Sequence, residues 1–444
     1  MSFRIGNVKI PGVQVYGAIR DGKWVRPAGW PDLYSLDISN EEALYLTYKT
    51  NEDNSFAAFK FTSTGSWYVD IGTIQNAAYV VKETSEALSS GDSYLKDLRG
   101  YAEDYVVLRV RGIIRSTGYG GIFGNDAVKY DKDGRSLNAN TQLLLEAYGR
   151  LPSANTIQAM FRGSRFITSV RLIDMESLTT IERAFNEAPR LQNVYISGTV
   201  ERIHAYLAFQ ASYSVTYVYL NGMKLGNINQ IFSGTALAFS DIETCEVTNN
   251  DTLQQAFDGT RLKSYNFKHW TINANGANYC FRNTRCAEVI DTSTWVINGT
   301  VTSMFQNSGV TEMPQLSDWS GVTGNANIIS DSSVSGDIVL PEMASSVTTV
   351  GSGFDGARCV TSITIPARYT TVPANAFRNT WNCSEIHFLA TTPPTLENSN
   401  AFTSGTNKYL QIFVPYSSDH SVLEAYQTAS NWSAVASKIV EESE

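Results

Sequence analysis

The stretch AFRNTWNCSEIHF (residues 376–388) has four partial copies elsewhere in the chain. All share one frame: a small or apolar residue, Phe, any residue, Gly or Asn, a small residue and then an apolar strand. The copies are MFRGSRFITSVRL (160–172), AFDGTRLKSYNF (256–267), CFRNTRCAEVI (280–290) and GFDGARCVTSITI (353–365). A frame that recurs along the chain indicates a structural repeat rather than a single site.

The Phe of this frame, here called the anchor, recurs 23 to 25 residues apart through eleven units. The anchors are Phe161, Phe185, Phe209, Phe232, Phe257, Phe281, Phe305, Ile329, Phe354, Phe377 and Phe402. One such unit cannot bury its apolar side alone, whereas stacked units bury a continuous core. The spacing therefore predicts a solenoid in which each anchor stacks on the anchors of the neighbouring units.

Each unit also carries the signals of a turn and of a strand. A Gly or Asn two residues after the anchor, as at Gly259 and Asn283, indicates a turn, because both residues tolerate positive φ. An apolar residue follows five or six positions after the anchor. Alternating apolar residues, such as Ile363 and Ile365, then predict a short half-buried strand.

Four of the five cysteines are accounted for by packing rather than by chemistry. Cys280 takes a slot that holds Ala in other units, and Cys286 and Cys359 sit five residues after their anchors. Cys383 takes the neighbouring slot. We expect these thiols to be small core residues and not a redox or metal site.

Residues 363–402, ITIPARYTTVPANAFRNTWNCSEIHFLATTPPTLENSNAF, resemble the BspA-like leucine-rich repeat family. The tail, with VP, EAY and NWS, resembles the strand and helix that close such arrays. Units in the middle, such as 291–313, are similar to a related bacterial-surface repeat. The resemblance covers about residues 150–440. It implies a non-enzymatic surface or secreted adhesion protein of bacteria, or a virion protein of phages that infect gut Bacteroidetes, with no catalytic residues.

The first third of the chain does not follow the repeat. Residues 1–35 are rich in Gly, Pro and Trp, which suits an extended attachment segment. Strand-like runs in residues 36–135 suggest a small antiparallel β-sandwich. NANTQLLLEAYGRL (138–151) predicts an amphipathic helix with Asn140 or Thr141 as N-cap, and residues 85–98 predict a loop or short helix.

We therefore expect a mainly β chain: a small antiparallel domain followed by a leucine-rich-repeat-like solenoid of about eleven units with a parallel sheet. The solenoid would span residues 136–415, with its N-terminal cap in 136–160. A helical cap would follow in residues 416–444.

Composition narrows the possible functions. The net charge is −9, whereas a nucleic-acid-binding protein is usually basic. The N-terminal stretch lacks the apolar segment of a secretory signal, and no apolar run is long enough to cross a bilayer. The histidines show no metal-ligand spacing, and the acidic stretch DKDGR (131–135) predicts a turn rather than a Ca²⁺ site. We expect no cofactor and no metal.

The outward positions of the strands are the expected ligand-binding face. Tyrosine offers a rigid flat surface and a hydroxyl, which together suit recognition of sugars or proteins. These positions are Arg171, Asn193, Tyr195, Tyr217, Tyr219, Asn266, Lys268, Glu385 and His387. Each could equally be an ordinary polar residue of an exposed sheet, or lie under a neighbouring subunit.

The sequence predicts a non-enzymatic phage virion protein, namely a head or tail fibre or receptor-binding protein. Its N-terminal part would attach to other virion proteins, and its repeats would recognise a host-surface glycan or protein. We expect a homo-oligomer, with a trimer as the usual solution for fibres. One alternative is a BspA-like adhesin on a bacterial cell surface, and another is a carbohydrate-active enzyme with an N-terminal catalytic domain.

Overall fold

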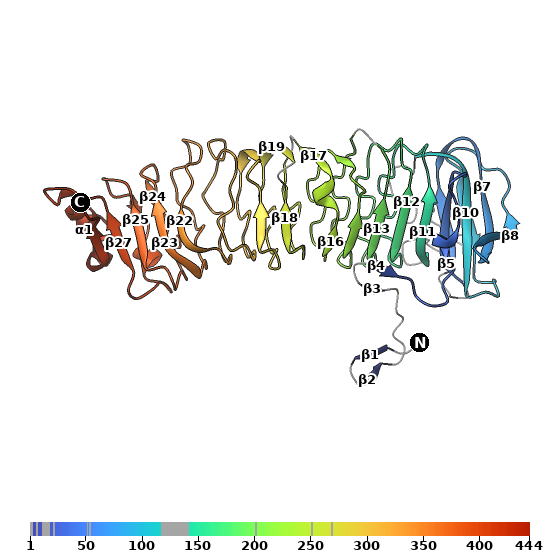
Figure 1. Ribbon diagram of the computed structural model, residues 1–444, viewed down its shortest axis with the longest axis horizontal. Coiled ribbons are helices and arrows are strands. Elements are labelled where there is room, and N and C mark those ends of the chain that lie inside the picture. Colours follow the sequence, from blue (N-terminus) through green and yellow to red (C-terminus); the bar gives the residue numbers. More distant parts are fainter. Residues whose placement is uncertain are drawn as a thin grey trace. The chain divides into compact units, whose positions relative to one another are not determined.

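The computed structural model shows a mainly β protein of two compact units (Figure 1). Unit 1 comprises residues 1–226 and 234–245, and unit 2 comprises residues 227–233 and 246–444. The residues that the structure describes are 3–5, 8–10, 18–20, 23–50, 52, 55–116, 142–199, 202–249, 252–267 and 270–444.

Unit 1 is built on a sheet with the strand order β16-β14-β13-β12-β11-β5-β10-β7-β8. From β11 to β16 the strands are parallel, and from β11 through β5 to β8 they are antiparallel (Figure 1). The strands are β5 (Ala43–Lys49), β7 (Thr62–Gln75), β8 (Ala78–Thr84), β10 (Tyr105–Ser116), β11 (Leu144–Arg150), β12 (Ser169–Ile173), β13 (Asn193–Ile196), β14 (Tyr217–Tyr219) and β16 (Phe239–Ser240). The predicted antiparallel region before a parallel array is confirmed, and the two parts share one hydrogen-bonded sheet. The predicted domain boundary near residue 135 stays a prediction.

Two local predictions in unit 1 are wrong. The predicted helix at 138–151 is instead strand β11, in which every residue before Arg150 is buried. A strand covered on both faces reads as a continuous apolar run, which periodicity alone does not separate from a helix. The predicted loop or short helix at 85–98 contains β9 (Ser93–Asp97), which pairs with β6 (Phe56–Lys60). Asn140 and Thr141, the expected N-caps, lie outside the described residues.

Part of the N-terminal segment packs on the chain's own sheet. Leu33, in the 3₁₀ turn η1 (Leu33–Ser35), is buried in a cluster that includes Tyr45 and Tyr148 of the sheet. Nε of Arg26 donates to Oε2 of the buried Glu146 at 3.0 Å. Before this point the backbone forms the hairpins β1 (Phe3–Ile5) with β2 (Val8–Ile10) and β3 (Ala18–Arg20) with β4 (Lys23–Val25). Attachment to a partner through residues 1–35 stays a prediction.

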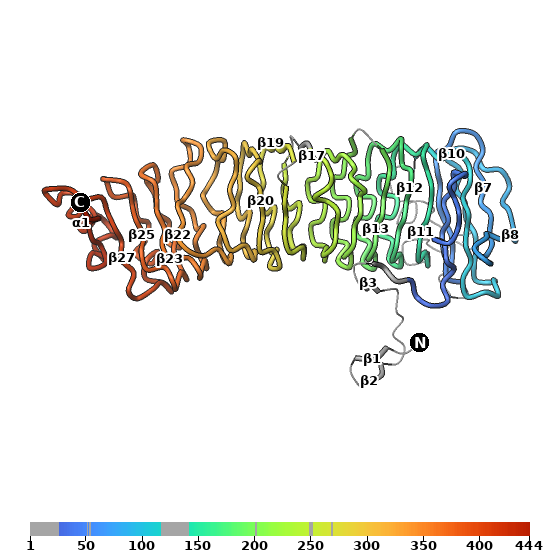
Figure 2. The backbone as a smooth tube through the Cα atoms, in the orientation of Figure 1, coloured from blue at the N-terminus to red at the C-terminus, as the bar shows by residue number. Residues whose placement is uncertain are grey.

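Unit 2 continues the repeat as parallel pairs of short strands, and Figure 2 shows its successive coils lying one against the next. The pairings are β17-β19-β21, β18-β20, β22-β23-β25-β27-β28 and β24-β26. The bounds are β17 (Glu246–Asn249), β18 (Ser264–Asn266), β19 (Thr271–Gly276), β20 (Val289–Asp291), β21 (Val296–Thr300), β22 (Ser335–Val339), β23 (Cys359–Ile365), β24 (Thr371–Val372), β25 (Glu385–Phe388), β26 (Thr395–Leu396), β27 (Gln411–Val414) and β28 (Ile439–Glu441).

The anchors form the core of both units, and each is at most 2% exposed. In unit 1 the rings of Phe161 and Phe185 stack with centroids 5.7 Å apart. In unit 2, Phe281 stacks between Phe257 at 5.3 Å and Phe305 at 5.5 Å, and the ring planes differ by 2° and 4°. The stacking that the 24-residue spacing predicts is therefore present.

The turn around each anchor is fixed by the backbone. Gly259 has φ +81° and Asn283 has φ +63°, as the Gly and Asn two residues after the anchor predict. In the units from Phe161 to Phe305, a second residue of positive φ lies two positions before the anchor, as at Tyr279 with φ +58°. This second position has no Gly or Asn to mark it in the sequence. Between the two, the N–H of Phe257 donates to the carbonyl of Cys280 in the next repeat at 2.9 Å.

The prediction for the cysteines is right at Cys280 and Cys383, which are buried, and wrong at Cys286 and Cys359, which are exposed. The buried position after these two anchors belongs to the residue six places on, such as Ala287. In other units the residue five places after the anchor takes this core position, as Leu237 does after Phe232 and Val310 does after Phe305.

The predicted C-terminal helical cap is confirmed. Helix α1 (Ser421–Thr428) and the 3₁₀ helix η4 (Ser433–Lys438) follow β27, and β28 then extends the sheet. Tyr426 and Trp432 are both fully buried, and Trp432 packs against Phe388 with ring centroids 5.2 Å apart. These aromatic residues cover the last coil, which would otherwise expose its apolar side.

Candidate binding site

One row of side chains crosses the sheet of unit 1. Its register pairs Tyr148 with Arg171, Arg171 with Tyr195, and Tyr195 with Tyr219. Directly paired residues on adjacent strands point to the same side of a sheet, so these four share one face. The guanidinium of Arg171 lies 4.7 Å from the ring centroid of Tyr195, a cation–π contact that holds the arginine against the face.

A second row on the same face is aromatic at its far end. It pairs Asn193 with Tyr217, and Tyr217 with Phe239. The ring of Tyr217 stacks on that of Tyr219 with centroids 4.4 Å apart, and Phe239 is 46% exposed. Partial burial and the neighbouring hydroxyl of Tyr219 raise the pKa of Tyr217, so its phenol keeps its proton.

Tyr34 covers this face at strand β12, whereas the face is uncovered over strands β13, β14 and β16. The hydroxyls of Tyr34 and Ser169 lie 2.7 Å apart, and Nδ2 of Asn193 donates to Oγ of Ser169 at 3.0 Å. Asn193 is only 7% exposed, so it is not presented to a ligand. Over β13, β14 and β16 the aromatic side chains are half-buried or exposed. We call Tyr195, Tyr217, Tyr219 and Phe239 the aromatic strip.

Sequence reasoning missed three members of this face. Tyr148 lies in the run that was predicted to be a helix, and Tyr34 lies in the segment that was predicted to attach to a partner protein. Phe239 belongs to a strand of two residues, too short for an alternation signal. Periodicity could not have found Tyr148, because strand β11 is buried along almost its whole length and shows no alternation.

The expected positions in unit 2 do not form one site. Asn266 is exposed on β18 and Glu385 is exposed on β25, and these strands belong to different sheets. His387 is half-buried, with its ring stacked on Phe413 at 4.7 Å and its Nδ1 hydrogen-bonded to Glu442. Lys268 lies outside the described residues.

Asp70, a buried carboxylate of strand β7, is held as a structural ion. Oδ2 of Asp70 accepts from Nη2 of Arg109 at 2.7 Å and from Nε of Arg111 at 2.9 Å. Burial acts to raise the pKa of Asp70, but these hydrogen bonds outweigh it and lower the pKa. A general acid needs the opposite shift.

Among the described residues, no group of three or more His, Cys, Asp or Glu side chains could hold a metal ion. Residues 131–135, the acidic loop, lie outside them. Within the same part of the chain, no helix is long and apolar enough to cross a membrane.

Comparison with known families matches six copies of the BspA type leucine rich repeat region, in residues 153–252 and 335–426. The repeats in these two stretches therefore match the BspA type of leucine-rich repeat. Residues 253–334 lie between the two matched stretches, and there Phe257, Phe281 and Phe305 continue the stack of anchors. No curated protein and no solved structure matches the chain. Repeats of this type are found in surface and adhesion proteins, and such solenoids typically serve as binding scaffolds rather than enzymes.

Proposed function

We propose that the chain is a non-enzymatic recognition protein that binds a surface glycan or protein through the aromatic strip of unit 1. The observation that carries the proposal is the continuous aromatic surface over β13, β14 and β16, where Tyr217 and Tyr219 stack and Phe239 is exposed. Flat aromatic surfaces pack on the apolar face of sugar rings and on peptide side chains, and phenol groups add hydrogen bonds.

The strip is also preorganised for binding. Tyr217 contacts both Tyr219 and Phe239, and the guanidinium of Arg171 lies over the ring of Tyr195. Side chains that are already packed lose little rotamer freedom when a ligand binds, so more of the contact energy appears as affinity.

The finer form of the proposal places the chain on a phage particle, as a head or tail fibre or receptor-binding protein. Its N-terminal part would attach to other virion proteins, and three copies would assemble as a fibre. The repeat type and the low charge content support this form. The alternative is an adhesin on a bacterial cell surface. The enzyme alternative gains no support from Asp70, one buried acid of unit 1, because two arginines hold it ionised.

A glycan array tests the binding face. The Tyr195→Ala and Tyr219→Ala variants should each lose at least tenfold in affinity for any glycan that the protein binds. Tyr213→Ala is the matched control, because Tyr213 is 67% exposed in the same unit but lies outside the strand face. Unchanged binding by both strip variants would remove the aromatic strip from the proposal.

Mass spectrometry of purified phage particles tests the location. The chain should be present in virions at a copy number divisible by three, and light scattering should give the mass of a trimer. Absence from particles, together with labelling on intact bacterial cells, would favour the adhesin.

A further inference from the structure

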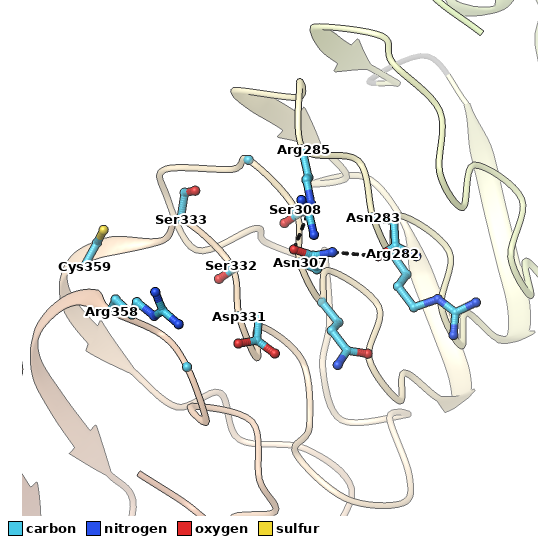
Figure 3. A pocket seen from close by; sticks show the side chains of 13 residues that line it. Arg282, Asn283, Arg285, Asn307, Ser308, Asp331, Ser332, Ser333, Arg358 and Cys359 are labelled. Atoms are coloured by element: carbon cyan, nitrogen blue, oxygen red, sulfur yellow. Dashed lines mark hydrogen bonds between the residues drawn. The ribbon is translucent and has the colours of Figure 1, made fainter. Parts of the chain in front are cut away.

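Unit 2 contains a hollow of about 810 Å³ (Figure 3). It lies along the turns that follow four successive anchors, from Phe281 to Phe354. Figure 3 shows Arg285, Asn307 and Ser308 on one side, Arg358 on the other, and Ser332 and Asp331 between them. A volume of this size fits an oligosaccharide of two or three rings, whereas a single small anion would fill only a fraction of it.

The lining is positive although the chain as a whole is acidic. It holds three arginines and one carboxylate, Asp331, in a chain of net charge −9. Arg282 is engaged by Asp258, with Nη2 and Oδ2 2.5 Å apart. Among the described residues, Arg285 and Arg358 have no carboxylate partner within ion-pair distance. Two guanidinium groups are thus available to an anion.

Both available arginines are held in place by other contacts. Nε of Arg285 donates to Oδ1 of Asn307 at 3.1 Å, and Nδ2 of Asn307 donates to Oδ1 of Asn283 at 2.7 Å. The guanidinium of Arg358 lies 4.9 Å from the ring centroid of Trp381, which is 54% exposed. The terminal nitrogens of these arginines can therefore donate to a ligand without a large loss of side-chain freedom.

The floor of the hollow has hydroxyl groups with no partner. In the neighbouring repeats a Thr occupies the third position after the anchor, and its hydroxyl donates to the anchor carbonyl, as Thr284 does to Phe281 at 2.6 Å. Ser308 and Ser332 occupy this position in the hollow and are 3% and 5% exposed. Their hydroxyls make no hydrogen bond to any described residue. A buried hydroxyl without a partner is costly, and a ligand that bonds to it removes that cost.

We propose that this hollow binds an acidic saccharide. Carboxylates on separate rings would pair with Arg285 and with Arg358, and ring hydroxyls would bond to Ser308, Ser332 and Asn307. The arginines supply charge-assisted hydrogen bonds to these carboxylates, and the serines supply directional bonds that a simple anion does not use. This site is independent of the aromatic strip, which lies in unit 1.

Isothermal titration with galacturonate and glucuronate trisaccharides tests the site, with their methyl esters as uncharged counterparts. The acids should bind, and the esters should bind at least tenfold more weakly. Arg285→Gln and Arg358→Gln should each weaken binding of the acids at least tenfold. Arg261→Gln is the matched control, because Arg261 is exposed at the same position after its anchor but lies one repeat outside the hollow.

The serine variants separate binding from folding. Ser308→Ala and Ser332→Ala should weaken binding several-fold while leaving the free energy of unfolding unchanged or higher, because each removes an unbonded buried hydroxyl. Competition by acetate or inorganic phosphate at concentrations equal to the saccharide would show a simple anion site and overturn the saccharide assignment. No binding of either acid, or equal binding of acid and ester, would overturn the proposal. The Tyr195→Ala variant should bind these saccharides with unchanged affinity, so the proposals for the hollow and for the aromatic strip are tested independently.

Discussion

The stack of anchors predicts a large and local loss of stability when one ring is removed, and Phe281→Ala is the sharpest case. The side chain is fully buried and stacks on Phe257 at 5.3 Å and Phe305 at 5.5 Å. Trp295 packs beside it at 5.8 Å. Truncation of a buried Phe to Ala costs about 3–5 kcal/mol, and lost ring contacts favour the upper part of that range. We therefore expect a loss of about 4 kcal/mol.

Urea denaturation followed by circular dichroism measures the loss, and hydrogen exchange locates it. In a solenoid each repeat contacts only its neighbours, so exchange should quicken in the coils around Phe257, Phe281 and Phe305. The N–H of Phe281 donates to the carbonyl of Met304 at 2.8 Å, which makes it a direct reporter.

Two further variants serve as controls for the loss of the Phe281 ring. Phe281→Leu keeps most of the volume and should cost less than about 1.5 kcal/mol. Tyr409→Ala removes a ring that is 73% exposed and should change the free energy of unfolding by less than about 0.5 kcal/mol. If Phe281→Ala cost no more than Tyr409→Ala, the anchors would not be the core of the repeat.

Three other outcomes follow from the structure. A maleimide should label two thiols in the folded protein and five after denaturation, as counted by intact mass. The labelled pair should be Cys286 and Cys359, which are exposed. Burial raises the pKa of Cys383 to about 12, and burial also protects Cys245 and Cys280 from the reagent. Burial raises the pKa of Glu146 to about 7 from its ordinary 4.5, so the folded form binds more protons in this window and the free energy of unfolding should fall as pH rises from about 4.5 to about 7. Denaturant titrations at a series of pH values should show this slope in the native chain and not in Glu146→Gln. Gly259→Ala should lower the free energy of unfolding in urea by about 1 kcal/mol, because φ there is +81° while no atom lies within 4 Å of an added Cβ. Gly100→Ala is equally open and has no positive φ, so it should change the free energy of unfolding little. Equal losses in the two variants would refute the argument from backbone conformation.

Much of the fold could be predicted because the repeat is local. Each anchor, its turn and its strand lie within 24 residues, and eleven copies of a weak signal together make a strong one. The sequence therefore predicted the burial of the anchors and the positive φ of Gly259 and Asn283. It did not predict the exposed Cys286, because offsets of five and six residues both occur among the units.

The candidate sites depend on contacts that no local pattern records. Residues 144–150 became a strand because β5 on one side and β12 on the other supply hydrogen bonds, although the run is apolar enough for a helix. Residues 26–38 close one end of the strand face, which only the bond from Arg26 to Glu146 and the packing of Tyr34 reveal. The hollow in unit 2 gathers Arg285 and Arg358 from units that lie 73 residues apart in the sequence.

The sequence by itself determined the period, the anchors and the parallel solenoid, because these rest on short-range spacing and on the need of each unit to bury its apolar side against a neighbour. Only the tertiary structure decided which polar residues of the outer surface are covered, which are held in place and which are left without partners. The physical reason is that a surface side chain is constrained by its neighbours in space, and the stacking of coils places next to it residues that are 24 positions away or more.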